Sequence, residues 1–232
     1  MPVIEFAGVS HAYPDAAGQA TTVLREVSVR LTEHRIGVIG ANGSGKSTFA
    51  RMLNALVVPS VGSVRVDGLD TAREARAIRR RVGFCFTDPD AQIVMPTVQE
   101  DLAFSLRRRH LPKDEVARRV EAALDTYGLA AYRTQPAHLL SGGQKQLLAL
   151  AAVLVTDPAL VVMDEPTTLL DLANAVRVRE RVRALAPQVV LVTHQLDLLD
   201  QFDRVLVFHE GRLVFDGAPA DAVAHYRGLV LT

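Results

Sequence analysis

The sequence predicts an α/β protein built around a parallel β-sheet. Its apolar runs at residues 35–39, 82–86, 160–163 and 189–193 have the pattern of strands that are covered on both faces of such a sheet. A glycine-rich turn at residues 40–48 follows the first run and precedes an expected helix. Residues 97–155 are expected to be mainly helical, because apolar residues recur there at three- and four-residue spacing.

The composition indicates one neutral chain that can bury a large core. Its 232 residues include 26 basic and 26 acidic side chains, so the formal net charge is zero. This balance argues against nucleic acid as the main partner, because phosphate neutralisation usually leaves a basic surplus. The single cysteine, Cys85, excludes a disulfide framework and fits a reducing compartment. We expect neither a signal peptide nor a membrane helix, since no apolar run approaches roughly 20 residues.

The remaining elements are expected along the rest of the chain. Residues 3–10 and 22–31 alternate apolar and polar side chains, which predicts antiparallel strands with one wet face. Residues 13–18 between them are expected to form a loop. The other expected elements are a strand at 63–68, a basic surface helix at 71–81, helices at 99–109, 113–127, 147–155 and 172–186, a hairpin at 205–215, and a short helix after Gly217.

The glycine-rich turn reads GANGSGKST and matches the phosphate-binding pattern GxxxxGK[ST] between a strand and a helix. Glycines let a backbone wrap closely around phosphates and direct its N–H groups inward, and the helix adds the positive end of its dipole. Lys46 then places a charge on the β- and γ-phosphates, and the Ser47 hydroxyl can ligate Mg²⁺. A glycine turn with a stray lysine would leave the flanking strand and helix unexplained. The sequence therefore predicts a nucleotide-binding P-loop.

Further candidate residues follow other predicted strands and helices. Asp164 and Glu165 end the run at 160–163, where the first carboxylate is suited to hold Mg²⁺ and the second to deprotonate a water. Adjacent acids at a strand end often form only a solvated turn, but a P-loop in the same chain favours the functional interpretation. Ser141, followed by two glycines, is expected to cap a helix and create a second anion-binding terminus. His194 ends the last parallel strand.

These motifs make the chain resemble the nucleotide-binding subunit of ABC transporters over essentially its whole length. They are the P-loop at 40–48, the LSGGQ signature at 140–144, Asp164-Glu165-Pro166, Leu170-Asp171 and His194. The signature is far more specific than the P-loop, which many NTPase families share. The resemblance implies a single nucleotide-binding domain over residues 1–232. It comprises a P-loop NTPase (RecA-like) core sheet, an N-terminal antiparallel β subdomain and a helical subdomain at about 90–158 that carries the signature.

The resemblance also implies roles for single residues in binding and hydrolysing ATP. Tyr13 matches the aromatic residue that stacks on adenine. Glu165 matches the general base, and His194 the residue that contacts the γ-phosphate and the attacking water; Lys46 completes the catalytic set. The phosphate cradle matches Asn42, Gly43, Ser44, Gly45, Lys46, Ser47 and Thr48.

A second subunit is implied as well. In the family, the residues that match Ser141 and Gly143 bind the γ-phosphate held by the other subunit's P-loop. Asp171 closes the loop that faces this subunit. One P-loop and one signature on opposite edges of a domain imply a head-to-tail dimer, expected to be a homodimer, with two ATP molecules between the copies.

One position departs from the family pattern. Such subunits usually carry a glutamine after the strand that ends at Phe86, where it contacts Mg²⁺ and links to the membrane partner, and this chain has Thr87. We therefore expect Mg²⁺ to be held by Ser47, Asp164 and the Thr87 hydroxyl. Asp88 and Gln92 are the alternatives that would cover the missing glutamine.

Three kinds of ABC protein are considered as assignments for this sequence. DNA-repair and chromosome ATPases insert a long coiled coil or a large lobe before the signature, whereas this chain has room only for a small helical lobe. Translation-factor ABC proteins carry two cassettes in one chain, and this chain has one. A transporter ATPase, at the cytoplasmic face of the cell membrane, fits best.

Among transporters, the segment TDPDAQ at 87–92 resembles the loop of energy-coupling factor importers, which contacts coupling helices of a membrane scaffold subunit. The wider stretch 86–97 looks most like the ATPase of the biotin-specific member, with cobalt or nickel importers as the alternative. We expect residues 88–95 to contact the scaffold, and a substrate-binding membrane subunit to be served only indirectly. Ile93, Val94 and Met95 either form an apolar groove for this contact or seal the helical lobe against the core.

Overall fold

The computed structural model describes residues 1–14, 19–168 and 170–231, and its backbone divides into two compact units. The first unit comprises residues 1–83, 159–165 and 185–232, and the second comprises residues 84–158 and 166–184. No helix in the described ranges is both long and apolar enough to cross a membrane.

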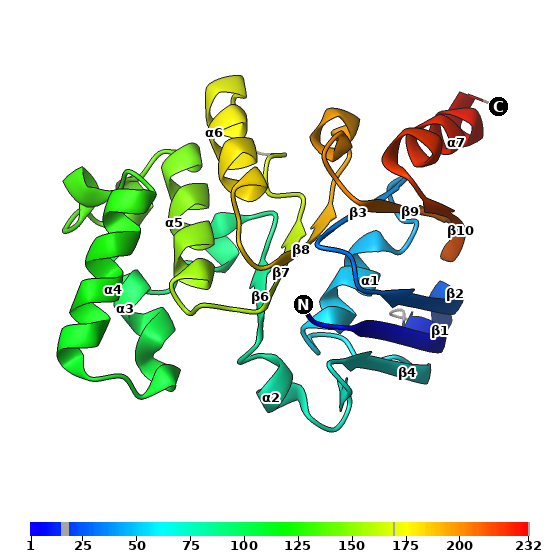
Figure 1. Cartoon of the computed structure of the whole chain (residues 1–232), viewed down its shortest axis with the longest axis horizontal. Coiled ribbons are helices and arrows are strands. Elements are labelled where there is room, and N and C mark those ends of the chain that lie inside the picture. The colour runs from blue at the N-terminus through cyan, green and yellow to red at the C-terminus, as the bar shows by residue number, and fades with distance from the viewer. Residues whose placement is uncertain (15–18, 169, 232) are drawn as a thin grey trace. The chain divides into compact units, whose positions relative to one another are not determined.

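The core sheet has the strand order β10-β9-β3-β8-β7-β6 (Figure 1). Strands β3, β7, β8 and β9 run parallel, and β10 pairs antiparallel with β9. Every residue of β3, β7 and β8 is buried, which explains their continuous apolar runs. The strands are β3 (Arg35–Gly40), β6 (Val82–Cys85), β7 (Leu160–Asp164), β8 (Gln188–Val192), β9 (Arg204–His209) and β10 (Arg212–Gly217).

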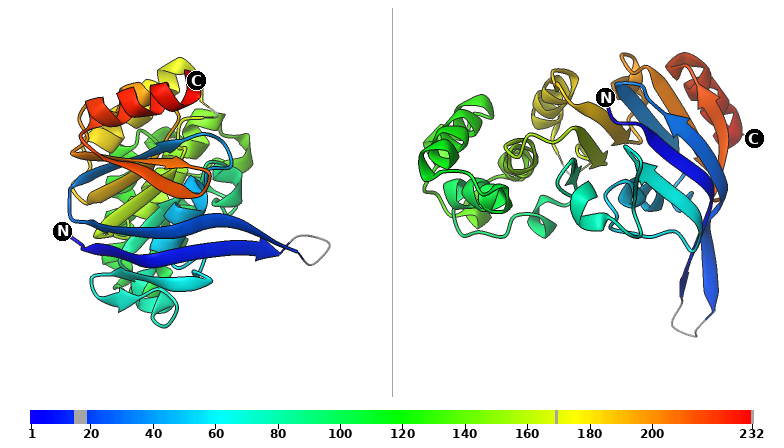
Figure 2. Two further views of the ribbon diagram at one scale, coloured as in Figure 1. Left: turned by 90° about the vertical axis from the view of Figure 1, so that its right-hand side faces the viewer. Right: turned by 60° about the horizontal axis from the view of Figure 1, so that its bottom comes forward.

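The first unit also holds an antiparallel sheet of order β2-β1-β4-β5. Its strands are β1 (Ile4–Pro14), β2 (Ala20–Leu31), β4 (Val61–Val66) and β5 (Leu69–Asp70). Figure 2 shows β1 and β2 side by side as a long ribbon. The prediction of a loop at 13–18 was wrong for its first two residues. Tyr13 and Pro14 still belong to β1, where they pair with Thr21 and Ala20. The other four residues of that loop, 15–18, lie outside the described residues.

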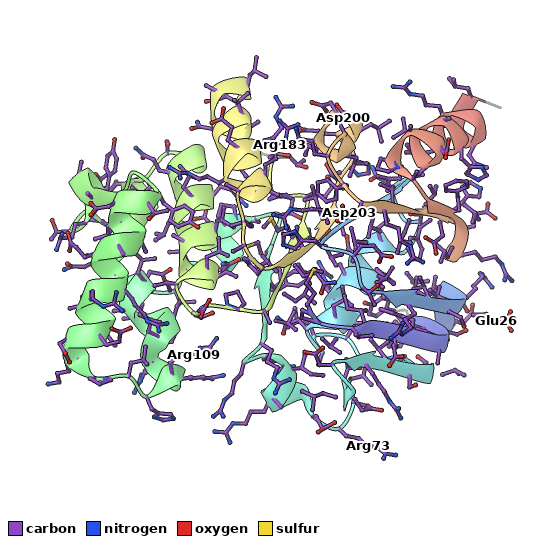
Figure 3. All side chains as sticks on the ribbon, in the orientation of Figure 1. Glu26, Arg73, Arg109, Arg183, Asp200 and Asp203 are labelled. Carbon is purple, nitrogen blue, oxygen red and sulfur yellow. The ribbon has the colours of Figure 1, made fainter. Side chains whose placement is uncertain are left out.

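Helix α1 (Lys46–Leu53) ties the P-loop to both sheets. Its Phe49 is fully buried and stacks on Phe6 of β1 at 4.3 Å between ring centroids, and it meets Phe208 of β9 at 5.0 Å. Helix α7 (Pro219–Leu231) packs on β9 and β10, as the expected C-terminal helix should. Charged side chains lie on the surface of this unit; Figure 3 shows those of Glu26 and Arg73 pointing away from it.

The predicted basic helix at 71–81 was too long. Helix α2 spans only Ala75–Ile78, and the chain straightens into β6 from Val82. Arg79 folds back instead, donating to the backbone carbonyls of Asn54 at 3.3 Å and Ala55 at 2.7 Å. Arginine spacing alone does not reveal such a tertiary contact.

The second unit is helical around one apolar cluster (Figure 1). Leu102 of α3, Leu124 of α4 and Leu148 of α5 are fully buried in this cluster. The helices are α3 (Val98–Leu106), α4 (Lys113–Thr126), α5 (Gly142–Leu154) and α6 (Leu172–Arg183), with 3₁₀ turns η1 (Pro89–Ala91), η2 (Arg107–Arg109), η3 (Ala130–Tyr132) and η4 (Ala137–Leu139); a fifth 3₁₀ turn, η5 (Leu196–Leu199), belongs to the first unit. The expected helix at 99–109 therefore ends earlier, and the one expected from 147 begins five residues sooner, at Gly142.

Candidate functional site

The P-loop requires glycine at two of its positions. Gly40 ends β3 with φ +150°, and a Cβ atom there would lie 2.2 Å from the Phe208 carbonyl oxygen. Gly45 precedes α1 with φ +99°, and a Cβ atom there would lie 2.7 Å from the Val23 carbonyl oxygen. Backbone on the neighbouring strands therefore presses against the loop from behind, and only residues without a side chain fit. Ala41, Asn42 and Gly43 form its exposed part.

Ser44 is the feature of the loop that points to a ligand. The residue is buried, yet its hydroxyl finds no hydrogen-bond partner within the described part of the chain. Buried polar groups are rarely left unpaired, because losing water without a replacement costs roughly 1–3 kcal/mol. The orphan hydroxyl in a cradle of backbone N–H groups therefore fits a site for a phosphate oxygen.

Lys46 is held by the loop itself. Its Nζ donates to the carbonyl oxygens of Gly40 at 2.8 Å and Ala41 at 2.7 Å. Burial lowers the pKa of Lys46, while the negative charges of Glu165 and Asp164 act in the opposite direction. Its position at the loop and its positive charge suit the ammonium group to bind a phosphate.

Asp164 occupies the tip of β7 and meets two side chains of α1. The Ser47 hydroxyl donates to Asp164 Oδ1 at 2.9 Å, and an Arg51 nitrogen lies 3.9 Å from Oδ2. Burial raises the pKa of Asp164, although the Ser47 hydrogen bond and the Arg51 charge work against this. Sequence reasoning missed Arg51. Its spacing of four residues from Ser47 places both on one face of α1, which was the available signal.

Glu165 and His194 form a close pair at the ends of β7 and β8. His194 Nε2 lies 2.6 Å from Glu165 Oε1. The Glu165 amide donates to the Val192 carbonyl at 3.0 Å, and the residue has φ +53°. This left-handed backbone conformation is unusual for a side chain with a Cβ atom, and strain of this kind concentrates at functional sites. It turns the glutamate out of the strand direction and toward the histidine.

Tyr13 lies near the P-loop helix rather than in a free loop. Its hydroxyl is 3.4 Å from Oγ1 of Thr48, and its ring meets the edge of the His11 ring at 4.6 Å between centroids. The side chain stays 38% exposed. A ring that is positioned by contacts at its hydroxyl and beside His11, and that keeps part of its surface exposed, is suited to stacking.

The signature begins helix α5 in the second unit, and the predicted N-cap at Ser141 is confirmed. Ser141 Oγ accepts from the Gln144 amide at 3.3 Å, and the Gln144 side chain accepts from the Ser141 amide at 2.8 Å. This capping box leaves the other amides of the first turn for a ligand. A Cβ atom on Gly143 would lie 2.2 Å from the Asn174 side chain, and Asn174 in turn donates to Asp171. Sequence reasoning did not anticipate the contact with Asn174.

Thr87 and its neighbours begin the second unit. Gln92 uses both ends of its amide there: Oε1 accepts from the Phe86 amide at 3.2 Å, and Nε2 donates to the Ala149 carbonyl at 2.7 Å. Asp88 accepts from the Asp90 amide at 2.9 Å. Of the two alternatives to Thr87, Gln92 would have to break two hydrogen bonds to bind metal, which makes it the weaker one.

Comparison with known proteins agrees with this arrangement. The family model described as ABC transporter matches residues 24–168. The chain is 55% identical over 225 residues to a putative ABC transporter ATP-binding protein of Deinococcus radiodurans, with 97% of both chains covered. This chain belongs to the ABC transporter family.

Other relatives of this ABC transporter protein carry more specific names. It is 46% identical to a biotin transport ATP-binding protein of Rhizobium etli, over 96% of each chain. It is 44% identical to an energy-coupling factor transporter ATP-binding protein of Symbiobacterium thermophilum, over 96% of this chain and 82% of that one.

A solved ABC structure supports the fold. Superposition on cbiO1 of Clostridium perfringens, described as part of the ABC transporter complex cbiONQ, gives a TM-score of 0.81 at 30% identity, covering 98% of this chain and 93% of that one. The predicted fold class is therefore confirmed, and the protein is an ABC transporter ATPase that binds ATP.

Proposed function

We propose that this ATPase powers an energy-coupling factor importer of biotin. The observation that carries the proposal is the 46% identity, over 96% of both chains, to the biotin transport ATP-binding protein of Rhizobium etli. The segment 87–92 supports the same type of importer, because it resembles the loop that meets a membrane scaffold. The ATPase would act from the surface of the membrane.

The substrate is tested by purifying the intact transporter from its native membrane and identifying the bound small molecule by mass spectrometry. Biotin in the complex is the expected result. A metal ion or another vitamin, retained through washing at matched protein concentration, would contradict the biotin assignment and leave the ATPase assignment standing.

Within this proposal, each catalytic side chain has a task. Glu165 accepts the proton of the water that attacks the γ-phosphate. His194, 2.6 Å from this carboxylate, orients it and would contact the same phosphate. Lys46 exchanges its carbonyl partners for the β- and γ-phosphates, and Tyr13 stacks on the adenine. The remaining phosphate contacts come from the loop residues 42–48.

Mg²⁺ fits the donors at the end of β7. A hydroxyl and a carboxylate are the hard oxygen ligands this ion prefers, and Ser47 and Asp164 already lie 2.9 Å apart, oxygen to oxygen. When bound, the ion would neutralise charge on the β- and γ-phosphates. Thr87 is proposed as a third contributor through its hydroxyl, in place of the family's glutamine.

Replacing Thr87 tests this metal role. Thr87→Val keeps the shape of the side chain and removes the hydroxyl, so we expect slower ATP hydrolysis at limiting Mg²⁺. Thr87→Gln restores the usual ligand and is expected to keep the rate. Titrating Mg²⁺ in a steady-state ATPase assay measures both variants. A Thr87→Val rate and Mg²⁺ dependence equal to the parent's would show that Ser47, Asp164 and water suffice.

Two copies are proposed to assemble head to tail. Ser141 and Gly143 of one copy would meet the γ-phosphate on the P-loop of the other. The capped start of α5 supports this, because Ser141 and Gly142 are exposed and the helix start offers amide groups and a dipole end to an anion. Asp171, which caps α6 by accepting from the Asn174 amide at 2.8 Å, would face the second copy.

The loop 88–95 is proposed to contact the membrane scaffold, and its apolar residues differ in burial. Val94 is 61% exposed, whereas Ile93 packs against the apolar cluster of the second unit. Ile93 therefore belongs to the helical unit, and Val94 faces outward, where it is available to a partner. A substitution at Ile93 would confuse folding with partner binding, so Val94 is the better probe.

Val94→Asp is expected to abolish association with the scaffold and to stop uptake, because it places a charge in an apolar contact. Melting temperature and ATP binding of the isolated chain should not change. Val61→Asp is the matched control, since Val61 is 63% exposed on β4 of the first unit. Co-purification with the scaffold is the measurement. Equal recovery of scaffold with both variants would place the contact elsewhere.

A further inference from the structure

The loop after β6 is fastened to the signature helix by side chains that neither the sequence motifs nor the proposed function assign. Lys145 Nζ donates to both carboxylate oxygens of Asp90, at 2.7 and 3.0 Å. Lys145 lies in the first turn of α5, and Asp90 lies in η1. The ion pair therefore joins the start of the signature helix to the middle of the loop.

The backbone of Lys145 contacts the signature as well. Its backbone amide donates to the Ser141 carbonyl at 2.9 Å, within the first turn of α5. One residue thus contacts the signature serine through its backbone and the loop through its side chain. The Lys145 side chain is mostly buried, at 16% exposure, which limits the directions in which its ammonium group can point.

A second contact fixes the orientation of the loop. Gln92 donates to the Ala149 carbonyl at 2.7 Å, and its Oε1 holds the Phe86 amide. Ala149 follows Lys145 by four residues, so both contacts lie on one face of α5, one turn apart. Two attachments to one helix face prevent the loop from pivoting about either of them.

The far half of the loop is attached to the same helical unit. The buried carboxylate of Asp101, in α3, accepts from the amides of Val94 at 2.9 Å and Met95 at 3.1 Å. Helix α3 shares the apolar cluster with α5. Contacts at residues 90, 92, 94 and 95 therefore attach the loop to α5, which carries the signature, and to α3, which packs with it.

We propose that Lys145 is a positioning residue that transmits movement of the signature to the partner-facing loop. Asp90 is 62% exposed, so the ion pair contributes little to folding stability. Its effect is geometric: when Ser141 and Gly143 engage ATP, the loop follows α5 because Lys145 and Gln92 hold it there. The inference rests on the proposed role of the loop, but its test needs no membrane partner.

Hydrogen exchange of the intact chain, measured by mass spectrometry with and without ATP, tests this coupling. The background is Glu165→Gln, which is expected to retain ATP. We expect ATP to slow exchange both at the start of α5 and at residues 90–93. Lys145→Met should reduce the slowing at 90–93 by about threefold or more, while the start of α5 still responds.

Two further variants separate coupling from plain structural support. The exchanged pair, Asp90→Lys with Lys145→Asp, should restore the ATP response of the loop, because it rebuilds the ion pair with reversed polarity. Arg119→Met should not change it, although it removes an ion pair of 2.6 Å to Glu115 in α4 of the same unit. A structural role alone would change exchange without ATP and would leave the ATP-dependent difference intact.

Three results would overturn the inference: an unchanged loop response in Lys145→Met, an equal loss in Arg119→Met, or a parent loop that does not respond to ATP. The importer proposal fails in a different experiment. A loop that responds to ATP through Lys145, in a chain that recovers no membrane scaffold, would support the coupling and contradict the importer.

Discussion

Replacing Glu165 with glutamine is expected to slow ATP hydrolysis by roughly 10²–10⁴-fold, the usual contribution of a general base. ATP binding should persist, because the phosphate contacts come from the P-loop and not from this carboxylate. The amide keeps the shape of the side chain and a donor or acceptor for His194, whose Nε2 lies 2.6 Å away in the parent. Single-turnover hydrolysis with a separate nucleotide-binding measurement resolves the two effects.

Glu210→Gln is the matched control for this substitution. Glu210 also has a left-handed backbone, with φ +47°, but it lies in the β9–β10 turn. Its variant should hydrolyse ATP at the parent rate. Glu165→Gln with ATP should also form dimers in light scattering, since the second copy completes each site. Near-normal turnover by Glu165→Gln would remove the glutamate from the catalytic role.

Lys46→Ala is expected to eliminate measurable ATP hydrolysis and to weaken ATP binding. The variant removes the one cation that the loop holds against its own carbonyls, at 2.7 and 2.8 Å, in reach of the phosphate cradle. Without it, the negative β- and γ-phosphates face the Asp164 and Glu165 carboxylates with less compensation. Steady-state ATPase activity and nucleotide titration measure the change.

The control must distinguish the loss of the lysine charge near the phosphates from the loss of a donor to backbone carbonyls. Arg79→Met provides it, because Arg79 also donates to two carbonyls, those of Asn54 and Ala55, and is not part of the P-loop. We expect this variant to hydrolyse ATP normally. If Arg79→Met were as inactive as Lys46→Ala, the effect would come from the backbone around α1 and not from the phosphate.

The sequence predicted the runs that form β3, β6, β7 and β8, and the P-loop, because their signals are local; β9, which also runs parallel, was expected only as one arm of a hairpin. A strand such as β7 is buried throughout and apolar up to Asp164 since it is covered on both faces, and the loop needs glycine where Gly40 and Gly45 meet neighbouring backbone. Helix α2 was predicted too long because Arg79 binds carbonyls of another segment, which no periodicity encodes.

Within the candidate site, the sequence motifs name chemically distinctive residues such as Glu165 and Lys46, which belong to short motifs with fixed spacing. They do not name the side chains that lie next to motif residues. Arg51 lies beside Asp164 and Asn174 lies against Gly143, on elements whose approach depends on the tertiary fold. Gln92 was considered as a metal ligand, whereas its amide bridges two backbone groups. Single-sequence patterns do not report such long-range contacts.

The left-handed backbone of Glu165 limits the folding stability that this protein can reach. A residue with a Cβ atom pays on the order of 1–2 kcal/mol for that conformation, a cost that the rest of the fold must cover in every folded molecule. Glycine would relieve the strain and lose the carboxylate. With Glu165 as the proposed general base, selection for thermal resistance and selection for turnover would favour different residues at this peptide, and improvements in stability would have to come from other positions.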